Sequence, residues 1–184
     1  MGCLSGAIRT RVGYAGGHTA DPNYHSLGDH SETVQVDYDP TVVSYEELLD
    51  AFFALHDATY QIPKRQYMSA IFFLDSEQEQ AARDAVHRLE ANTGRQIKTV
   101  LQPLARFYPA EDYHQKYYLQ GDALLAGELR AFYPRFEEFV ASTAAMRVNA
   151  FLYGCATPDQ VRAELDRLGL SEAGKARLRR LTLE

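Results

Sequence analysis

The chain lacks several features that mark particular classes of protein. It has only two cysteines, Cys3 and Cys155, which are too few and too far apart for a disulfide scaffold and favour a reducing, cytoplasmic setting. The six histidines are scattered and neither cysteine has another nearby, so we expect no metal site. No apolar run approaches the length of a membrane span and no signal-peptide pattern is found, so we expect no membrane contact.

Positive charge is also scarce. The formal net charge of −6 argues against a nucleic-acid partner, because binding a phosphate backbone needs a basic surface. The most basic stretch, residues 175–180, alternates with leucine and indicates the exposed face of a last helix. At 184 residues the chain is long enough for one core with a helical extension, and too short for two ordinary domains.

The first part of the chain shows strand patterns separated by loops. Residues 8–14 have strand character and end at a Gly-Gly pair. Residues 32–38 alternate strictly, which predicts a half-buried strand with Val34, Val36 and Tyr38 on its inner face. The apolar run 70–74 predicts a strand buried on both faces, and residues 97–104 a further strand.

Helix signals lie between and after these strands. A capping box at Ser44 and Glu47 opens a helix, and a helix capped at Ser76 ends near Gly94. The stretch from Pro109 is expected to open the first of several short helices. The first helix is expected to bury an apolar stripe: Leu48, Leu49, Phe52, Phe53 and Leu55.

From about residue 121 onward, helix signals dominate. Thr157 caps a helix with proline at its first position, and Gly169 ends it before a last helix from Ser171. Apolar stripes there need a partner: Leu124, Leu125, Leu129, Phe132, Phe136, Phe139 and Val140. We predict an α+β fold in which residues 1–120 form a mixed β-sheet with flanking helices, a two-layer plait-like core. Residues 121–184 would form an all-helical C-terminal extension packed on it.

Residues 13–40 gather groups suited to one pocket. A glycine turn containing Tyr14 is followed by Asp-Pro-Asn ending in Tyr24, and Glu32 stands at the mouth of a strand. Ringed by Tyr14, Tyr24 and Tyr67, the Glu32 carboxyl group is placed to donate a proton. The residues alone favour a plainer interpretation, a solvated glutamate and tyrosines that cover a core.

Three motifs in order over about residues 6–120 resemble the peptide methionine sulfoxide reductases of the A class, which reduce the S epimer of methionine sulfoxide. Tyr24 ends Asp-Pro-Asn-Tyr, similar to the family's Asn-Pro-Thr-Tyr. Tyr67 lies in residues 65–71, which are similar to Gln-Tyr-Arg-Ser-Ala-Ile. Residues 107–119 form the third block.

The resemblance assigns roles to these residues. Glu32 matches the glutamate that protonates the sulfoxide oxygen, and Tyr24 and Tyr67 match tyrosines that hydrogen-bond this oxygen, with Tyr14 in the same pocket. A hydrogen-bond network behind the pocket is expected from four residues: His30, Glu111, Asp112 and His114. Without the resemblance, the charged turn at residues 111–114 would only complement a helix dipole.

Cys3 is the candidate nucleophile, because a thiol at a helix N-terminus is readily ionised. The family motif is Gly-Cys-Phe-Trp-Gly, whereas this chain has Leu4 and Ser5 after the cysteine. Either Gly2-Cys3 is the true motif with its helix deleted, or residues 4–8 match the end of that helix and Cys3 is accidental. We expect the family's N-terminal strand and first helix to be missing.

Cys155 is either a resolving thiol or an incidental buried cysteine, and its surroundings favour the second interpretation. It follows Tyr153 and Gly154 between helices and lacks the glycine-rich flanks found in the family. The choice between the two interpretations stays open on the sequence alone.

The resemblance implies thiol-dependent reduction of free or peptide-bound methionine-S-sulfoxide by a monomer. Cys3 would become a sulfenic acid, a second thiol would convert it to a disulfide, and a thioredoxin-like protein would reduce that disulfide. No metal or organic cofactor is implied. One alternative is a non-catalytic relative that binds a sulfoxide or thioether side chain without turnover. Another is an unrelated thiol enzyme, such as a peroxidase, that uses Cys3.

Overall fold

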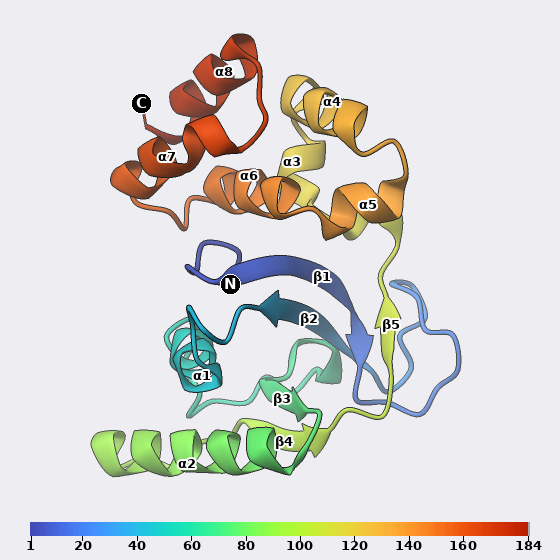
Figure 1. Ribbon diagram of the computed structural model, residues 1–184. Helices are drawn as coiled ribbons and strands as arrows, with labels where there is room; N and C mark the ends of the chain where they lie inside the picture. Colours follow the sequence, from blue (N-terminus) through green and yellow to red (C-terminus); the bar gives the residue numbers. More distant parts are fainter. Residues whose placement is uncertain (184) are drawn as a thin grey trace. The chain divides into compact units, whose positions relative to one another are not determined.

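The computed structural model describes residues 1–183, which belong to two compact units (Figure 1). We call Met1–Arg11, Gln35–Asp39 and Asp112–Glu184 the helical unit, and Val12–Val34 with Pro40–Glu111 the sheet unit. The boundary expected at residue 120 stays a prediction. No helix among residues 1–183 combines the length and apolarity that crossing a bilayer takes.

A three-stranded sheet has the order β2-β1-β5. Strand β1 (Ala7–Ala15) pairs antiparallel with β5 (Phe107–Pro109), so that Tyr14 lies opposite Tyr108. Strand β2 (Ser31–Tyr38) forms an edge, and the strands expected at residues 8–14 and 32–38 are confirmed. The expectation that Val34 lies on the inner face is wrong, because 46% of this residue is exposed. Alternation shows which residues share a face but not whether that face is covered.

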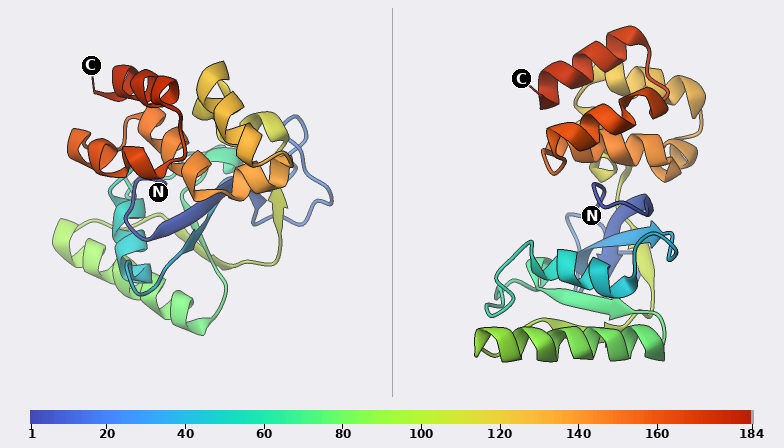
Figure 2. Two further views of the ribbon diagram at one scale, coloured as in Figure 1. Left: turned by 45° about the horizontal axis from the view of Figure 1, so that its top comes forward. Right: turned by 60° about the vertical axis from the view of Figure 1, so that its left-hand side comes forward.

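The second sheet pairs β3 (Ala70–Phe73) with β4 (Val100–Pro103) in parallel. Parallel strands need a long crossover, which α2 (Ser76–Thr93) provides. Helix α2 packs along this sheet and against α1 (Tyr45–Phe53) (Figure 2). The shared core consists of Leu49, Ile71, Ala82 and Ala85.

Several details of the sheet unit differ from the sequence-based expectation. The side chain that caps α2 is Asp75, one residue earlier than expected, and β4 is shorter than residues 97–104. The strand at residues 70–74 is not buried on both faces, since Phe72 is half-buried and Leu74 is exposed. Leu55 is also exposed, because α1 ends before it; the capping box that opens α1 is confirmed.

The helical unit contains η2 (Asp112–His114), α3 (Tyr117–Gln120), α4 (Ala123–Phe132), α5 (Phe136–Ala141), α6 (Thr143–Tyr153), α7 (Pro158–Glu164), η3 (Leu165–Arg167) and α8 (Glu172–Thr182). Helix α6 is central, with contacts to α3, α4, α5 and α8. The caps at Thr157 and Ser171 are confirmed. The helix expected to open at Pro109 is not found there, because Pro109 ends β5.

The core of the helical unit includes Leu119, Leu125, Leu129, Phe139, Val148, Phe151, Val161 and Leu178. Leu124 and Phe132 were expected to join it and instead are exposed. Hydrophobic spacing identifies the apolar stripe of a helix, but its edge residues can remain in water.

Two neighbouring leucines of α4 allow a matched test of this core. Leu125 is completely buried, whereas 44% of Leu124 is exposed. We expect Leu125→Ala to lower the free energy of unfolding by about 2–5 kcal/mol, because it removes buried methyl groups and leaves a cavity. Leu124→Ala should change it by no more than about 0.5 kcal/mol. Urea denaturation of both variants measures the difference, and equal losses would contradict the assigned core.

Candidate active site

The site begins with a glycine turn at the end of β1. The carbonyl oxygen of Gly16 accepts hydrogen bonds from Arg65 Nη2 at 2.7 Å and from Gln102 Nε2 at 3.1 Å. Gly16 has a φ of +83°, and a Cβ atom there would lie 2.5 Å from the ring of Phe72. Only glycine meets both conditions. The turn is thereby fixed to η1 (Arg65–Tyr67) and to β4.

The loop that follows is organised by Asp29. Its carboxylate accepts hydrogen bonds from the backbone N–H groups of His18, at 2.9 Å, and Thr19, at 3.0 Å, and from the Thr19 hydroxyl at 2.8 Å. These bonds hold the pKa of Asp29 well below its usual value of 3.8. The Asp29 carbonyl oxygen also accepts a hydrogen bond from Arg65 Nε, so Arg65 contacts both ends of the loop.

His30 closes this loop from the inside. It is almost fully buried, its Nδ1 accepts a hydrogen bond from Gly17 N at 3.2 Å, and its Nε2 lies 2.8 Å from the carbonyl oxygen of Thr19. An accepting Nδ1 requires the proton on Nε2, which then donates to Thr19. Both ring nitrogens of His30 are therefore used to hold the loop in shape.

Glu111 joins Tyr14 and Tyr24 of the sheet unit. The buried Tyr14 donates its hydroxyl hydrogen to Glu111 Oε2 at 2.6 Å, and the backbone N–H of Tyr24 donates to Oε1 at 2.9 Å. Asp112 and His114, expected on the same helical turn as Glu111, form η2 of the helical unit. There Gln120 donates to the carbonyl oxygen of Asp112 at 2.7 Å.

Glu32 is exposed at the start of β2, and its position is set by η1. The hydroxyl of the preceding Ser31 donates to the carbonyl oxygen of Arg65 at 2.8 Å. Gln66 Nε2 donates to Glu32 Oε1 at 2.6 Å. Tyr67 follows Gln66, and 46% of Tyr67 and 39% of Tyr24 is exposed. The sheet unit therefore exposes a carboxyl group and two tyrosines to solvent, while hydrogen bonds to the backbone fix the segments that contain Glu32 and Tyr24.

Two of these residues, Arg65 and Gln66, were not identified as functional from the sequence. They lie in the motif that contains Tyr67, which was the available signal. Spacing alone does not show that a glutamine amide at residue 66 reaches a carboxyl group 34 residues earlier.

The two cysteines lie in the helical unit, where they form a disulfide with their Cα atoms 6.0 Å apart. Cys3 is in a turn closed by a hydrogen bond from Leu4 N to Met1 O at 3.0 Å, and Cys155 follows the end of α6. The sequence left open whether Cys155 is a resolving thiol or an incidental cysteine, and favoured the second, because two cysteines 152 positions apart give no local signal that they meet. Cys3 and Glu32 belong to different units.

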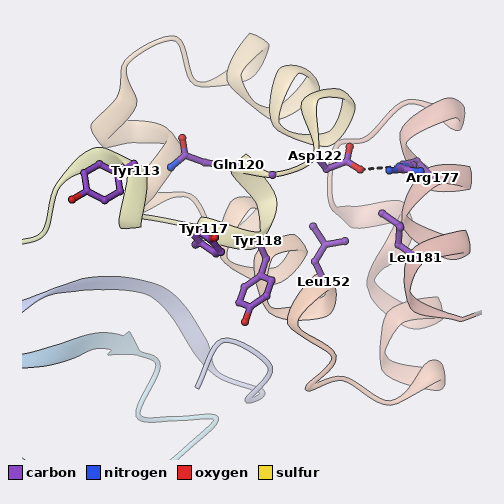
Figure 3. A pocket seen from close by; sticks show the side chains of 9 residues that line it. Tyr113, Tyr117, Tyr118, Gln120, Asp122, Leu152, Arg177 and Leu181 are labelled. Carbon is purple, nitrogen blue, oxygen red and sulfur yellow. Dashed lines mark hydrogen bonds and ion pairs between the residues drawn. The ribbon is translucent and has the colours of Figure 1, made fainter. Parts of the chain in front are cut away.

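A separate open cavity of about 560 Å³ lies in the helical unit, lined by Tyr113, Tyr117, Tyr118, Gln120, Gly121, Asp122, Leu152, Arg177 and Leu181 (Figure 3). Three of its polar side chains are already engaged: Arg177 Nε lies 2.7 Å from Asp122 Oδ2, and Gln120 donates to the carbonyl oxygen of Gln115 at 2.6 Å. Within residues 1–183 no cluster of three or more His, Cys, Asp or Glu side chains is arranged to hold a metal ion.

The chain matches known proteins over most of its length. A family model described as "Peptide methionine sulfoxide reductase" matches residues 1–132. The "Peptide methionine sulfoxide reductase" of Drosophila melanogaster is 41% identical over 172 residues, which span 92% of this chain and 69% of the relative. The "Peptide methionine sulfoxide reductase A5" of Oryza sativa subsp. japonica is 38% identical over 177 residues, spanning 91% and 69%.

Solved structures agree with these matches. Mxr1 from Saccharomyces cerevisiae in reduced form superposes with a TM-score of 0.57 at 30% identity, covering 61% of this chain and 70% of that one. Methionine sulfoxide reductase A of Corynebacterium diphtheriae gives 0.56 at 35% identity, covering 65% and 66%. The α+β fold class is confirmed by the strands and helices described above and by these neighbours.

The hydrogen bonds to Asp29 generate a pH prediction. Because its folded-state pKa is below the unfolded value, the ionised carboxylate stabilises the fold fully above pH 3.8, and this stabilisation is lost progressively as the pH falls from 3.8 through the folded-state pKa. We expect the urea midpoint to fall less between pH 6 and pH 3 in Asp29→Asn than in the unsubstituted protein. Asp84→Asn, at an exposed position of α2, controls for the lost charge. An identical pH dependence in Asp29→Asn would contradict the prediction.

Proposed function

The chain belongs to the peptide methionine sulfoxide reductase family, and we propose that Cys3 and Glu32 carry its reaction on the S epimer of methionine sulfoxide. The protein is an enzyme of thiol-dependent methionine sulfoxide reduction. The observation that carries the assignment of Cys3 is the Cys3–Cys155 disulfide, since a thiol reductase that recycles itself needs two thiols able to bond to each other.

The proposed reaction transfers one oxygen atom. The Cys3 thiolate attacks the sulfoxide sulfur while Glu32 gives a proton to the oxygen, and methionine leaves as Cys3 becomes a sulfenic acid. The Cys155 thiol then attacks the Cys3 sulfur, and water leaves as the disulfide forms. A dithiol reductant supplies two electrons and two protons to restore both thiols.

The sheet unit contributes the proton donor and the oxygen-binding groups in this proposal. Gln66 orients the Glu32 carboxyl group through one of its oxygens. Tyr24 and Tyr67, both partly exposed residues, hydrogen-bond the sulfoxide oxygen through their hydroxyls in this proposal, because negative charge develops on this oxygen in the transition state. Tyr14 supports Tyr24 indirectly, because the hydroxyl of this buried residue donates to the same Glu111 carboxylate that accepts a hydrogen bond from the Tyr24 backbone.

The reductant in this proposal is a thioredoxin-like protein, because a dithiol regenerates both cysteines without a metal or prosthetic group. The substrate is methionine-S-sulfoxide, either peptide-bound or free. The enzyme is expected to act as a monomer in the cytoplasm, with residues 121–184 as a helical extension of the core.

Two substitutions test the assigned nucleophile and acid. With an S-epimer methionine sulfoxide peptide and dithiothreitol, Cys3→Ser should abolish turnover. Glu32→Gln should lower kcat by about 10²–10⁴-fold, the usual effect of losing a general acid. Glu46→Gln, in the first turn of α1, is the control for a lost carboxylate and should keep full activity. Unchanged turnover in Cys3→Ser or in Glu32→Gln would refute the corresponding role.

A trapping experiment tests Cys155 as the resolving thiol. The reduced protein is freed of reductant and given one equivalent of sulfoxide peptide together with dimedone, which labels sulfenic acids. In Cys155→Ser the sulfenic acid at Cys3 persists, so we expect intact mass to show one dimedone adduct per chain. The unsubstituted protein should form the disulfide and remain unlabelled. Equal labelling of the two proteins would show that Cys155 does not resolve the intermediate.

A further inference from the structure

One buried arginine of the helical unit holds the chain on both sides of Cys3. Arg147 is only 8% exposed, and its Nη1 donates to the carbonyl oxygens of Gly2 at 2.7 Å and Leu4 at 2.8 Å. Its Nη2 lies 3.5 Å from the carbonyl oxygen of Ala7. The guanidinium fork suits this arrangement, because it presents several donors in a fixed plane.

A second contact reaches Cys3 itself. Gln160 Nε2, from α7, donates to the carbonyl oxygen of Cys3 at 2.6 Å. Glu164 connects the two supports, with Oε2 at 3.2 Å from Arg147 Nε and Oε1 at 3.3 Å from Gln160 Nε2. The carboxylate balances the buried charge of the arginine and orients both donors.

The N-terminal turn also packs closely on α6. A Cβ atom added at Gly2 would lie 2.9 Å from Ala150 Cβ and 3.3 Å from Met146 Cγ. Cys155 follows the same helix directly, after Gly154, whose φ of +87° ends α6. Both cysteines are therefore fixed relative to α6, Cys3 through hydrogen bonds and Cys155 through the chain.

We propose that Arg147 and Gln160 are positioning residues that keep the Cys3 sulfur beside the Cys155 sulfur when the disulfide is open. Their hydrogen bonds go to backbone carbonyl oxygens, so they do not depend on the sulfur–sulfur bond and persist after its reduction. Each thiol then faces the other at a high effective concentration, which favours disulfide formation over reaction with an external thiol.

This inference rests on the proposed function for its catalytic meaning, but the thiol–disulfide equilibrium can be measured without turnover. The full chain is equilibrated with mixtures of reduced and oxidised dithiothreitol, which donates two electrons and two protons as it forms its own ring disulfide. Remaining thiols are alkylated after an acid quench and counted by intact mass. The equilibrium constant gives the tendency of Cys3 and Cys155 to pair.

Arg147→Met and Gln160→Met remove the donors while keeping much of the side-chain volume. We expect Gln160→Met to shift the equilibrium towards the thiols by about threefold to tenfold, the effect of one lost hydrogen bond, and Arg147→Met by more than tenfold. Arg147→Lys should recover part of the loss. Arg162→Met is the matched control, because Arg162 is an exposed residue of α7 that pairs with Asp159, and it should leave the constant unchanged.

An unchanged constant in folded Arg147→Met or Gln160→Met would overturn the inference. If Arg147→Met does not fold, as judged by circular dichroism, Gln160→Met decides, because Gln160 is only half-buried. If the unsubstituted protein does not reduce methionine sulfoxide but the equilibrium constant is shifted in the variants, this inference stands and the proposed roles are refuted. Full reductase activity with an unshifted constant in the variants would refute this inference alone.

Discussion

The loop between β1 and β2 contributes little apolar surface to a core, so hydrophobic packing alone cannot order it. Leu27 is the buried aliphatic side chain that it contributes to the small core around Tyr14 and Ala110. The backbone N–H and C=O groups of such a loop need partners, and hydrophobic packing supplies none. Charged and polar side chains fill this need: Asp29 for the turn at residues 18–19, His30 for Gly17, and Arg65 for Gly16 and Asp29. The conformation of the whole region depends on these bonds.

This solution explains how the groups assigned to the reaction can be exposed and still be well placed. Glu32 follows Ser31, which is bonded to η1, and Tyr24 has its backbone bonded to Glu111. These hydrogen bonds therefore hold the backbone at and beside these residues, and they do not use the carboxyl and phenol groups themselves. The helical unit uses the same principle at Cys3, where the backbone rather than the sulfur is held by Arg147 and Gln160.

Features governed by neighbours in sequence were predictable. The cap at Thr157, the left-handed glycine after α2 and the capping box of α1 each depend on residues within one turn, and sequence patterns record such local chemistry. The family resemblance supplied Glu32 and the tyrosines. The Gln66–Glu32 bond and the exposure of Val34 were not predictable, and the cysteine pairing was only one of two open interpretations, because each depends on which distant segments meet.

The disulfide encloses most of the polypeptide, since its two cysteines lie 152 positions apart in the sequence. A protease that cuts one peptide bond between Cys3 and Cys155 would therefore produce two fragments that remain one covalent molecule. In the oxidised protein such a nick stays hidden during electrophoresis without reductant, and the fragments cannot diffuse apart. Reduction removes this tether, so the redox state of the thiol pair also decides whether a cleaved chain still holds together.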